Sequence, residues 1–460
     1  MGAPAAPRGR AALWLLVQVL AALCCCQWRA AAALRDRSVD KVFVVFSNHF
    51  DAGYTKNEEG SCAGAVLNQY FHEHIPNAIK TGRRARAEGG FEYRWLTQSW
   101  IIDVFLNCKE TPVGVSGRDL VCPTAEEVKA LEEGVREGWI SWHAFPFNAE
   151  PELYTPELFD AALNLTFRLD DRFGQPRKRT LSQRDVPGLT RSAVPLLARR
   201  GVRMVSVGEN MQIAPVNVPP VFVWSDLASG SEVLGLFHAN GYGRRRRLGG
   251  AAGAEGGAGA GAGAGAGTGP GASAAEEPLP DFDAPTADWD DLGRNGGEEQ
   301  HKHVECVDER DCVDDGPSLS LSRAGKVVSS GDSCVTVAAA RVAICTAWKQ
   351  DNEGPHAAWQ ARLIRLYARW RFPNAEVLSS RSFDDFADAV WPVRHTLPVV
   401  TQELGDTWIY GASSDPLKVA QVRAASRLYG ACMRQGGLAA CLGDASPQSE
   451  RALRTFEREL

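Results

Sequence analysis

Short apolar segments alternate with longer amphipathic segments along most of this chain, and this alternation constrains the fold more than any other feature. Residues 42–46 form a continuous run of β-branched and aromatic residues, which is typical of a parallel strand covered on both faces. Further strands are predicted at 91–96, 139–142, 202–207, 335–348 and 397–401. Helices are predicted after the capping box at Thr124, after Thr155 and over 357–370. Repeated strand–helix units predict a parallel sheet, and their number suits a barrel or a large open sheet.

Residues 1–33 are predicted to be a secretory signal peptide. Arg8 and Arg10 precede an apolar run over 11–26, and the small residues at 31–33 suit cleavage. The run is shorter than the ~20 apolar residues that a spanning helix needs, and no later stretch is apolar enough to cross a bilayer. We therefore expect a secreted or endomembrane-lumen protein with no stable membrane span after cleavage.

The cysteines fit this route. Three of the twelve cysteines lie in the predicted signal, which leaves an odd number in the mature chain. In an oxidising compartment most of these should pair, although the pairing cannot be read from the sequence. Asn164, in an Asn-Leu-Thr sequence, is a potential N-glycosylation site on the solvent side of its predicted helix.

The composition changes sharply at 244–333, where four arginines are followed by an Ala/Gly run and an acidic stretch. Such a segment cannot bury enough apolar surface to fold, so we predict a disordered insert. It divides the region of alternating strands and helices into parts at 40–243 and 334–425, and 426–460 is predicted to begin a helical region. A formal net charge of −6, with acids that compete for the four arginines, argues against a nucleic-acid partner.

The strongest local signal, His49-Phe50-Asp51, directly follows the first predicted strand. In parallel α/β folds, ligands bind beyond the carboxyl ends of the strands. His49 and Asp51 are two residues apart on an extended segment, so their side chains can point the same way and begin a Zn²⁺ site. Gly53 would let the backbone turn closely past the ion. The alternative is a strand-end histidine that is hydrogen-bonded to a turn aspartate.

The order of several motifs resembles the catalytic domain of family 38 α-mannosidases. His-x-Asp-x-Gly followed by an aromatic residue resembles that family's opening zinc motif, and the other segments that carry the likeness are 185–192, 195–201, 405–411 and 414–418. Within the segments 142–148, 183–188, 351–355 and 405–411, the chain is more similar to a divergent mannosidase-like family that is known only as a domain of unknown function.

The resemblance implies a (β/α)7-type barrel and one zinc ion that grips sugar hydroxyls. His49 and Asp51 match two metal-ligand positions, and His143 is a candidate for a further ligand, with a hydrogen-bonded histidine at the barrel rim as the alternative. The family's last ligand histidine lies in a helical bundle further along. Either the chain continues past Leu460, or it lacks that ligand and binds metal weakly.

The resemblance also implies two carboxyl groups that cleave a glycosidic bond with retention. The nucleophile position falls on Asn148 or Glu150, depending on the register, and only Glu150 could form the glycosyl ester. Asp185 is the second catalytic candidate, with a role in binding or positioning the substrate. The substrate-binding candidates are Asn148, Tyr54, Asp406 and Trp408.

Three functions follow from these observations. The leading hypothesis is a zinc-dependent retaining glycoside hydrolase, similar to the α-mannosidases, that acts on α-linked sugars of glycans. The first alternative is a secreted carbohydrate-binding pseudoenzyme, because the nucleophile and the downstream bundle are uncertain. The second alternative is a metal-dependent polysaccharide deacetylase, because related barrels also place His and Asp ligands at strand ends.

Overall fold

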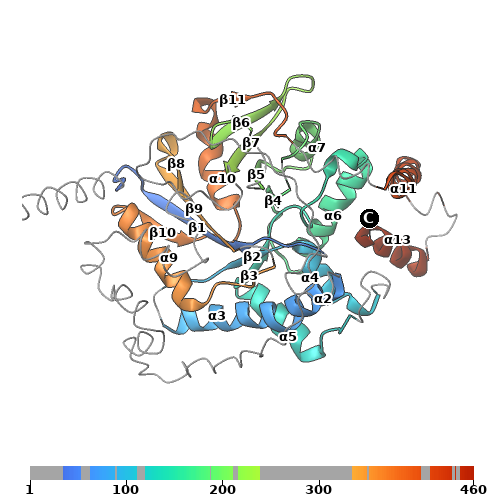
Figure 1. Cartoon of the computed structure of the whole chain (residues 1–460), viewed down its shortest axis with the longest axis horizontal. Coiled ribbons are helices and arrows are strands. Elements are labelled where there is room, and N and C mark those ends of the chain that lie inside the picture. The colour runs from blue at the N-terminus through green and yellow to red at the C-terminus, as the bar shows by residue number, and fades with distance from the viewer. Residues whose placement is uncertain are drawn as a thin grey trace, which may run out of the picture. The chain divides into compact units, whose positions relative to one another are not determined.

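A computed structural model of the chain (Figure 1) describes residues 35–52, 63–88, 91–110, 120–186, 188–210, 216–238, 334–349, 352–405, 415–437, 441 and 446–459. The predicted signal peptide, the predicted insert and the site candidates Tyr54, Asp406 and Trp408 lie outside these residues. What the sequence suggests about them stays a prediction.

The first sheet is built around β1. Its strands follow the order β3-β2-β1-β9-β8, and β10 also pairs with β1. All of its pairings are parallel except that of β8 with β9. The strands are β1 (Lys41–Asn48), β2 (Trp95–Thr97), β3 (Ile140–Trp142), β8 (Cys334–Val337), β9 (Val342–Lys349) and β10 (Glu376–Ser379).

The second sheet has the order β11-β6-β7-β5-β4. β5 pairs in parallel with β4 on one side and with β7 on the other. β6 pairs antiparallel with β7, and β11 pairs in parallel with β6. The strands are β4 (Thr180–Asp185), β5 (Met204–Glu209), β6 (Val221–Asp226), β7 (Ser231–His238) and β11 (Val399–Val400).

One apolar cluster joins the inner faces of the two sheets. Phe43 and Val45 of β1 belong to the same buried cluster as Leu234 and Leu236 of β7. The amide of Ala144, after β3, donates a 2.7 Å hydrogen bond to the carbonyl of Thr180 at the start of β4. The fold is therefore mixed α/β with parallel sheets and helices, as the alternation predicts, and closure into a barrel stays a prediction.

Helices cover the outer faces of the sheets. Side chains of α3, α4, α5 and α9 share a buried cluster with β1, whereas those of α6 and α7 pack on β5 and β7. Their bounds are α2 (Ala63–Gln69), α3 (Ile75–Ala87), α4 (Ser99–Leu106), α5 (Ala125–Arg136), α6 (Pro156–Arg172), α7 (Ala193–Arg199), α9 (Ala358–Arg371), α10 (Asp384–Val390), α11 (Pro416–Arg434) and α13 (Pro447–Glu459). Short helical turns are η1 (Tyr70–His74), η2 (Cys108–Glu110), η4 (Pro151–Leu153), η9 (Ala338–Ala340) and η10 (Trp391–Thr396).

Two predicted helix starts are confirmed by their caps. The Thr124 side chain accepts a hydrogen bond from the Glu127 amide, and the Glu127 side chain accepts one from the Thr124 amide. The Thr155 hydroxyl accepts from the Leu158 amide at the start of α6. These caps use amides that have no partner within the helix, so the sequence alone locates both starts.

Two predicted strands differ from the structure. The strand expected over 91–96 begins only at Trp95. One edge of β1 is shared by two strands, because β10 pairs with Lys41–Val44. Only Phe46 and Ser47 of that edge remain to pair with β2. The strand expected over 335–348 is a hairpin of β8 and β9. It turns at η9 and at Arg341, whose φ of 55° is left-handed.

Three disulfides lie in the described residues, and they pair six of the nine cysteines that follow residue 33. They join Cys108 to Cys122, Cys334 to Cys345, and Cys432 to Cys441. Asn164 is half-buried on α6, and its side-chain oxygen accepts a hydrogen bond from Arg200. A search of the described helices for one with the length and apolar character of a bilayer span finds none.

Candidate functional site

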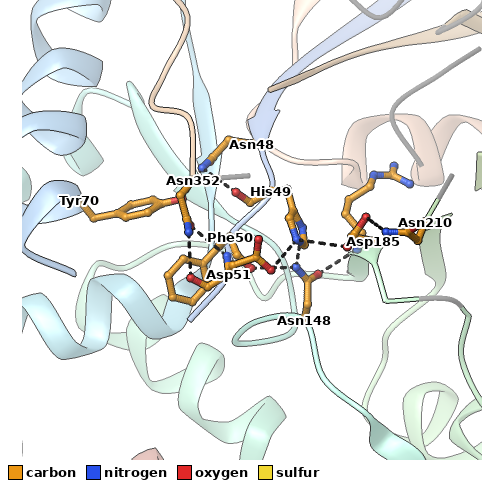
Figure 2. A network of polar contacts seen from close by, with 10 residues as sticks. Asn48, His49, Phe50, Asp51, Tyr70, Asn148, Asp185, Asn210 and Asn352 are labelled. Carbon is orange, nitrogen blue, oxygen red and sulfur yellow. Dashed lines mark hydrogen bonds and ion pairs between the residues drawn. The ribbon is translucent and has the colours of Figure 1, made fainter. Parts of the chain in front are cut away.

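Polar side chains gather beyond the carboxyl ends of the parallel strands, where the sequence predicts a site. His49 and Asp51 follow β1, Asn148 lies in the loop after β3, and Asp185 ends β4. Asn210 follows β5, and Figure 2 shows these residues in one network of polar contacts. The structure therefore brings together four of the residues that the sequence singles out.

His49 lies between two carboxylates. Its Nε2 is 2.9 Å from Oδ1 of Asp51 and 4.0 Å from Oδ2 of Asp185 (Figure 2). The imidazole is buried, with 1% of its side chain exposed, whereas the Asp51 and Asp185 side chains are 27% and 25% exposed. The carboxylates therefore remain accessible to a ligand, and the imidazole supports them from the protein side.

Asn148 contacts the other nitrogen of this imidazole. Its Nδ2 is 2.9 Å from Nδ1 of His49 and donates a 3.2 Å hydrogen bond to the carbonyl of Phe50. Its Oδ1 accepts a 2.9 Å hydrogen bond from the Arg184 amide. The amide of Asn148 is thus oriented by two backbone groups, one donor and one acceptor.

This orientation bears on metal binding. A histidine that binds a metal through one nitrogen normally donates a hydrogen bond from the other. The NH₂ group of Asn148 faces Nδ1 of His49, so Nδ1 must accept and Nε2 carries the hydrogen. In this arrangement the residues do not fit a zinc ion at Nε2 of His49.

The hydrogen bond of His143 joins it to its own loop and not to the network around His49. His143 is buried at the end of β3, and its Nδ1 accepts a 3.3 Å hydrogen bond from the Phe145 amide. Burial, aided by the charge of Arg184, lowers the pKa of His143 to about 3. Within the described ranges, no group of three His, Cys, Asp or Glu side chains is arranged to hold a metal ion. Metal ligation by Asp51 and His143 stays a prediction, whereas ligation by Nε2 of His49 does not fit the hydrogen bonds of Asn148.

Asp185 is held in an uncommon backbone conformation. Its φ of 68° lies in the left-handed region, which a residue other than glycine seldom adopts. Asn210 stabilises it, because its Nδ2 donates a 2.8 Å hydrogen bond to Oδ1 of Asp185 and its amide donates to the Asp185 carbonyl. Strain of this kind is often found at functional sites, and here it accompanies a carboxylate that reaches His49.

Asn352 fixes the backbone of the His49–Asp51 segment. Its Oδ1 accepts a 3.0 Å hydrogen bond from the Asp51 amide, and its Nδ2 donates one of equal length to the Asp51 carbonyl. Its own amide donates to the His49 carbonyl, and its φ of 52° is left-handed. Sequence reasoning missed this role, and the only signal was that Asn352 lies in one of the segments that resemble the mannosidase-like family.

The two nucleophile candidates, Asn148 and Glu150, lie in different surroundings. Asn148 contacts His49 directly, whereas the Glu150 carboxylate lies near Tyr154, where burial and the charge of Glu150 raise the pKa of the phenol. The residue that contacts His49 is therefore an amide, which cannot form a glycosyl ester.

Below this network, a polar layer lies between the two sheets. The Arg184 guanidinium is 4.1 Å from the ring centre of Trp348, and its Nη2 donates a 2.9 Å hydrogen bond to the Ser206 hydroxyl. His238 is also buried, and burial together with the charge of Arg184 lowers its pKa. Burial, aided by the charge of Arg184, thus favours the neutral form of His143 and His238.

Glu209 is a buried carboxyl group that sequence reasoning also missed. It pairs in register with Asp185, and Oε2 accepts a 3.2 Å hydrogen bond from the Val216 amide. Burial raises its pKa from the ordinary 4.5 to about 7. No pattern in the sequence distinguishes it, because its environment depends on residues more than 190 positions away, such as Gly405.

Comparisons with known proteins do not assign a family. No family model matches the chain, and no curated protein is similar to it in sequence. Among solved structures, an α-mannosidase from Enterococcus faecalis V583 has 15% identity and a TM-score of 0.46, and the match covers 79% of this chain and 31% of that one.

A glycosyl hydrolase family 38 protein from the same species has 12% identity and a TM-score of 0.38, over 79% of this chain and 29% of that one. A 4-α-glucanotransferase from Thermococcus litoralis has 9% identity and a TM-score of 0.30, over 44% and 28%. This chain therefore spans less than a third of the length of each of these three proteins.

Proposed function

We propose that this chain is a retaining glycoside hydrolase that acts on α-linked sugars of glycans. The observation that carries the proposal is the pair of accessible carboxylates, Asp51 and Asp185, on either side of Nε2 of His49. Their contacts with this one nitrogen place the two facing oxygens within about 7 Å of each other. Retaining glycosidases hold their two carboxyl groups about 5–5.5 Å apart, a separation that this upper limit includes.

The chemistry assigns one role to each carboxyl group. Asp185 attacks the anomeric carbon, and the bond to the leaving sugar breaks as its oxygen takes a proton from Asp51. The Nε2–H of His49 then stabilises the Asp51 carboxylate through the 2.9 Å hydrogen bond. Water cleaves the glycosyl ester in the second step and returns its proton to Asp51, so the configuration is retained. Glu150 is the alternative nucleophile.

We also propose that the chain works in the secretory pathway or outside the cell. Three disulfides support this location, because such bonds persist mainly in oxidising compartments. A glycan substrate is available in the same compartments.

The test is cleavage of a panel of aryl α-glycosides, α-mannosides first, by the full chain. We expect Asp185→Asn and Asp51→Asn to lower kcat/KM by at least ~10²-fold. Asp171→Asn is the matched control, since this aspartate is 67% exposed in an ion pair with Arg177, and its activity should equal that of the wild type. Glu150→Gln decides between the two nucleophiles. Failure of the wild type to cleave any glycoside would overturn the proposal.

A second candidate function is carbohydrate binding without hydrolysis. Asn148 favours it, because an amide contacts His49 where the resemblance implies a nucleophile. Calorimetric titration with α-linked oligosaccharides separates the two functions. Sugar binding without turnover, with a dissociation constant that Glu150→Gln leaves unchanged, would establish the binding protein and exclude the hydrolase.

A further inference from the structure

We propose that Asn148 holds His49 in the Nε2–H tautomer and so keeps this site free of zinc, and that an aspartate in its place would create a zinc site. The inference rests on the proposed function only for the roles of Asp51 and Asp185. Its evidence is the set of hydrogen bonds around Asn148 and His49.

The first step is the orientation of the Asn148 amide. The Arg184 amide can only donate, and it lies 2.9 Å from Oδ1 of Asn148. The Phe50 carbonyl can only accept, and it lies 3.2 Å from Nδ2. If the amide were reversed, its NH₂ group would face the Arg184 amide, which is also a donor, and its oxygen would face the Phe50 carbonyl, which is also an acceptor. The backbone therefore fixes the NH₂ group toward His49.

The second step is the tautomer of His49. With the NH₂ group 2.9 Å from Nδ1, this nitrogen has to supply a lone pair. The hydrogen then lies on Nε2, which donates to Asp51 at 2.9 Å. The imidazole is buried, so water does not compete for either nitrogen.

The third step is the consequence for a metal. Zinc takes the lone pair of a neutral imidazole nitrogen, and the other nitrogen then needs an acceptor for its hydrogen. Asn148 offers a donor at that position. Nε2 already faces the carboxylates of Asp51 and Asp185, which are suitable ligands, so the tautomer is what opposes zinc.

An aspartate at position 148 reverses this condition. One carboxylate oxygen would still accept from the Arg184 amide, and the other would accept from Nδ1–H of His49. Nε2 would then present its lone pair between Asp51 and Asp185. The cost is the lost hydrogen bond to the Phe50 carbonyl, so we expect the metal-free Asn148→Asp chain to melt at a lower temperature than the wild type.

The experiment measures zinc directly in the full chain. Wild type, Asn148→Asp and the control Asn374→Asp are dialysed against zinc and then against buffer, and zinc per chain is measured by mass spectrometry. Asn374 is exposed in the loop after α9, so its variant adds the same charge away from the site. We expect less than ~0.1 zinc per chain in the wild type and the control, and close to one in Asn148→Asp.

A second measurement reports the tautomer without reference to activity. Long-range ¹H–¹⁵N NMR spectra of the imidazoles, assigned with His49→Gln, should show Nε2 protonated in the wild type and Nδ1 protonated in Asn148→Asp. Stoichiometric zinc in the wild type that is lost in His49→Gln, or a wild-type Nδ1–H, would overturn the inference. So would an Asn148→Asp chain that stays free of zinc. Glycoside cleavage by a zinc-containing wild type would contradict this inference and leave the hydrolase intact.

Discussion

At the scale of single residues, Glu209 links the site to pH. Burial raises its pKa to about 7, so the folded chain binds a proton there that the unfolded chain releases near pH 4.5. The stability that this proton provides is complete below pH 4.5 and is lost as the pH rises through 7. We expect the free energy of unfolding to fall by about 3 kcal/mol over this range because of Glu209.

The check is urea unfolding of wild type and Glu209→Gln between pH 4 and 8. The glutamine variant keeps an acceptor for the Val216 amide and cannot titrate, so its stability should vary less with pH than that of the wild type. Parallel pH curves for the two proteins would show that Glu209 is not the group responsible.

Single residues also show what the sequence could and could not predict about the site. His49, Asp51 and Asn148 follow predicted strands, and Asp185 lies in a segment that carries the resemblance, so local pattern and resemblance were enough to find these four residues. Asn352 reaches Asp51 across 301 positions, and the burial of Glu209 likewise depends on distant segments. Such roles arise only from tertiary contacts, and a single sequence does not reveal them.

At the scale of elements, the loop after β4 is positioned by a close contact with the segment after β11. Gly188 has a φ of 107°, and a Cβ added to it would lie 1.3 Å from the carbonyl oxygen of Gly405. Nothing larger than glycine fits without separating the two segments. Because Asp185 lies three residues before Gly188, this contact also positions the candidate carboxylate.

We therefore expect Gly188→Ala to destabilise the chain by at least about 3 kcal/mol. Gly174→Ala is the matched control, because Gly174 has a φ of 58° and no atom within 4 Å of an added Cβ. That variant should lose only the roughly 1 kcal/mol of the left-handed backbone. Thermal and urea unfolding measure both, and equal losses would mean that the Gly188–Gly405 contact can adjust freely.

The elements themselves were predicted where local signals are strong. The caps at Thr124 and Thr155 and the buried run of β1 were sufficient for α5, α6 and the first strand. The length of β2 could not be predicted, because β10 occupies part of the edge of β1 with which β2 pairs. That arrangement depends on the whole sheet and not on the local sequence. The hairpin of β8 and β9 was missed because both of its strands are apolar.

At the scale of the whole molecule, the two sheets meet in an apolar cluster and, above it, in a polar contact. Arg184 extends from β4 of one sheet onto the ring of Trp348 in β9 of the other, at 4.1 Å. It also binds Ser206 of the neighbouring strand β5. The alternation of strands and helices predicted a parallel sheet, but only the folded chain shows two sheets with this buried cation between them.

This connection makes a final prediction about how the sheets are held together. Arg184→Lys keeps the charge but loses the planar group that stacks on Trp348, and we expect a loss of about 1–2 kcal/mol in urea unfolding. Arg83→Lys is the control, because that guanidinium lies 5.7 Å from the Trp139 ring with its side chain 54% exposed, and its loss should stay below about 1 kcal/mol. If the two variants lost equal stability, the stack between the sheets would contribute no more than a surface contact.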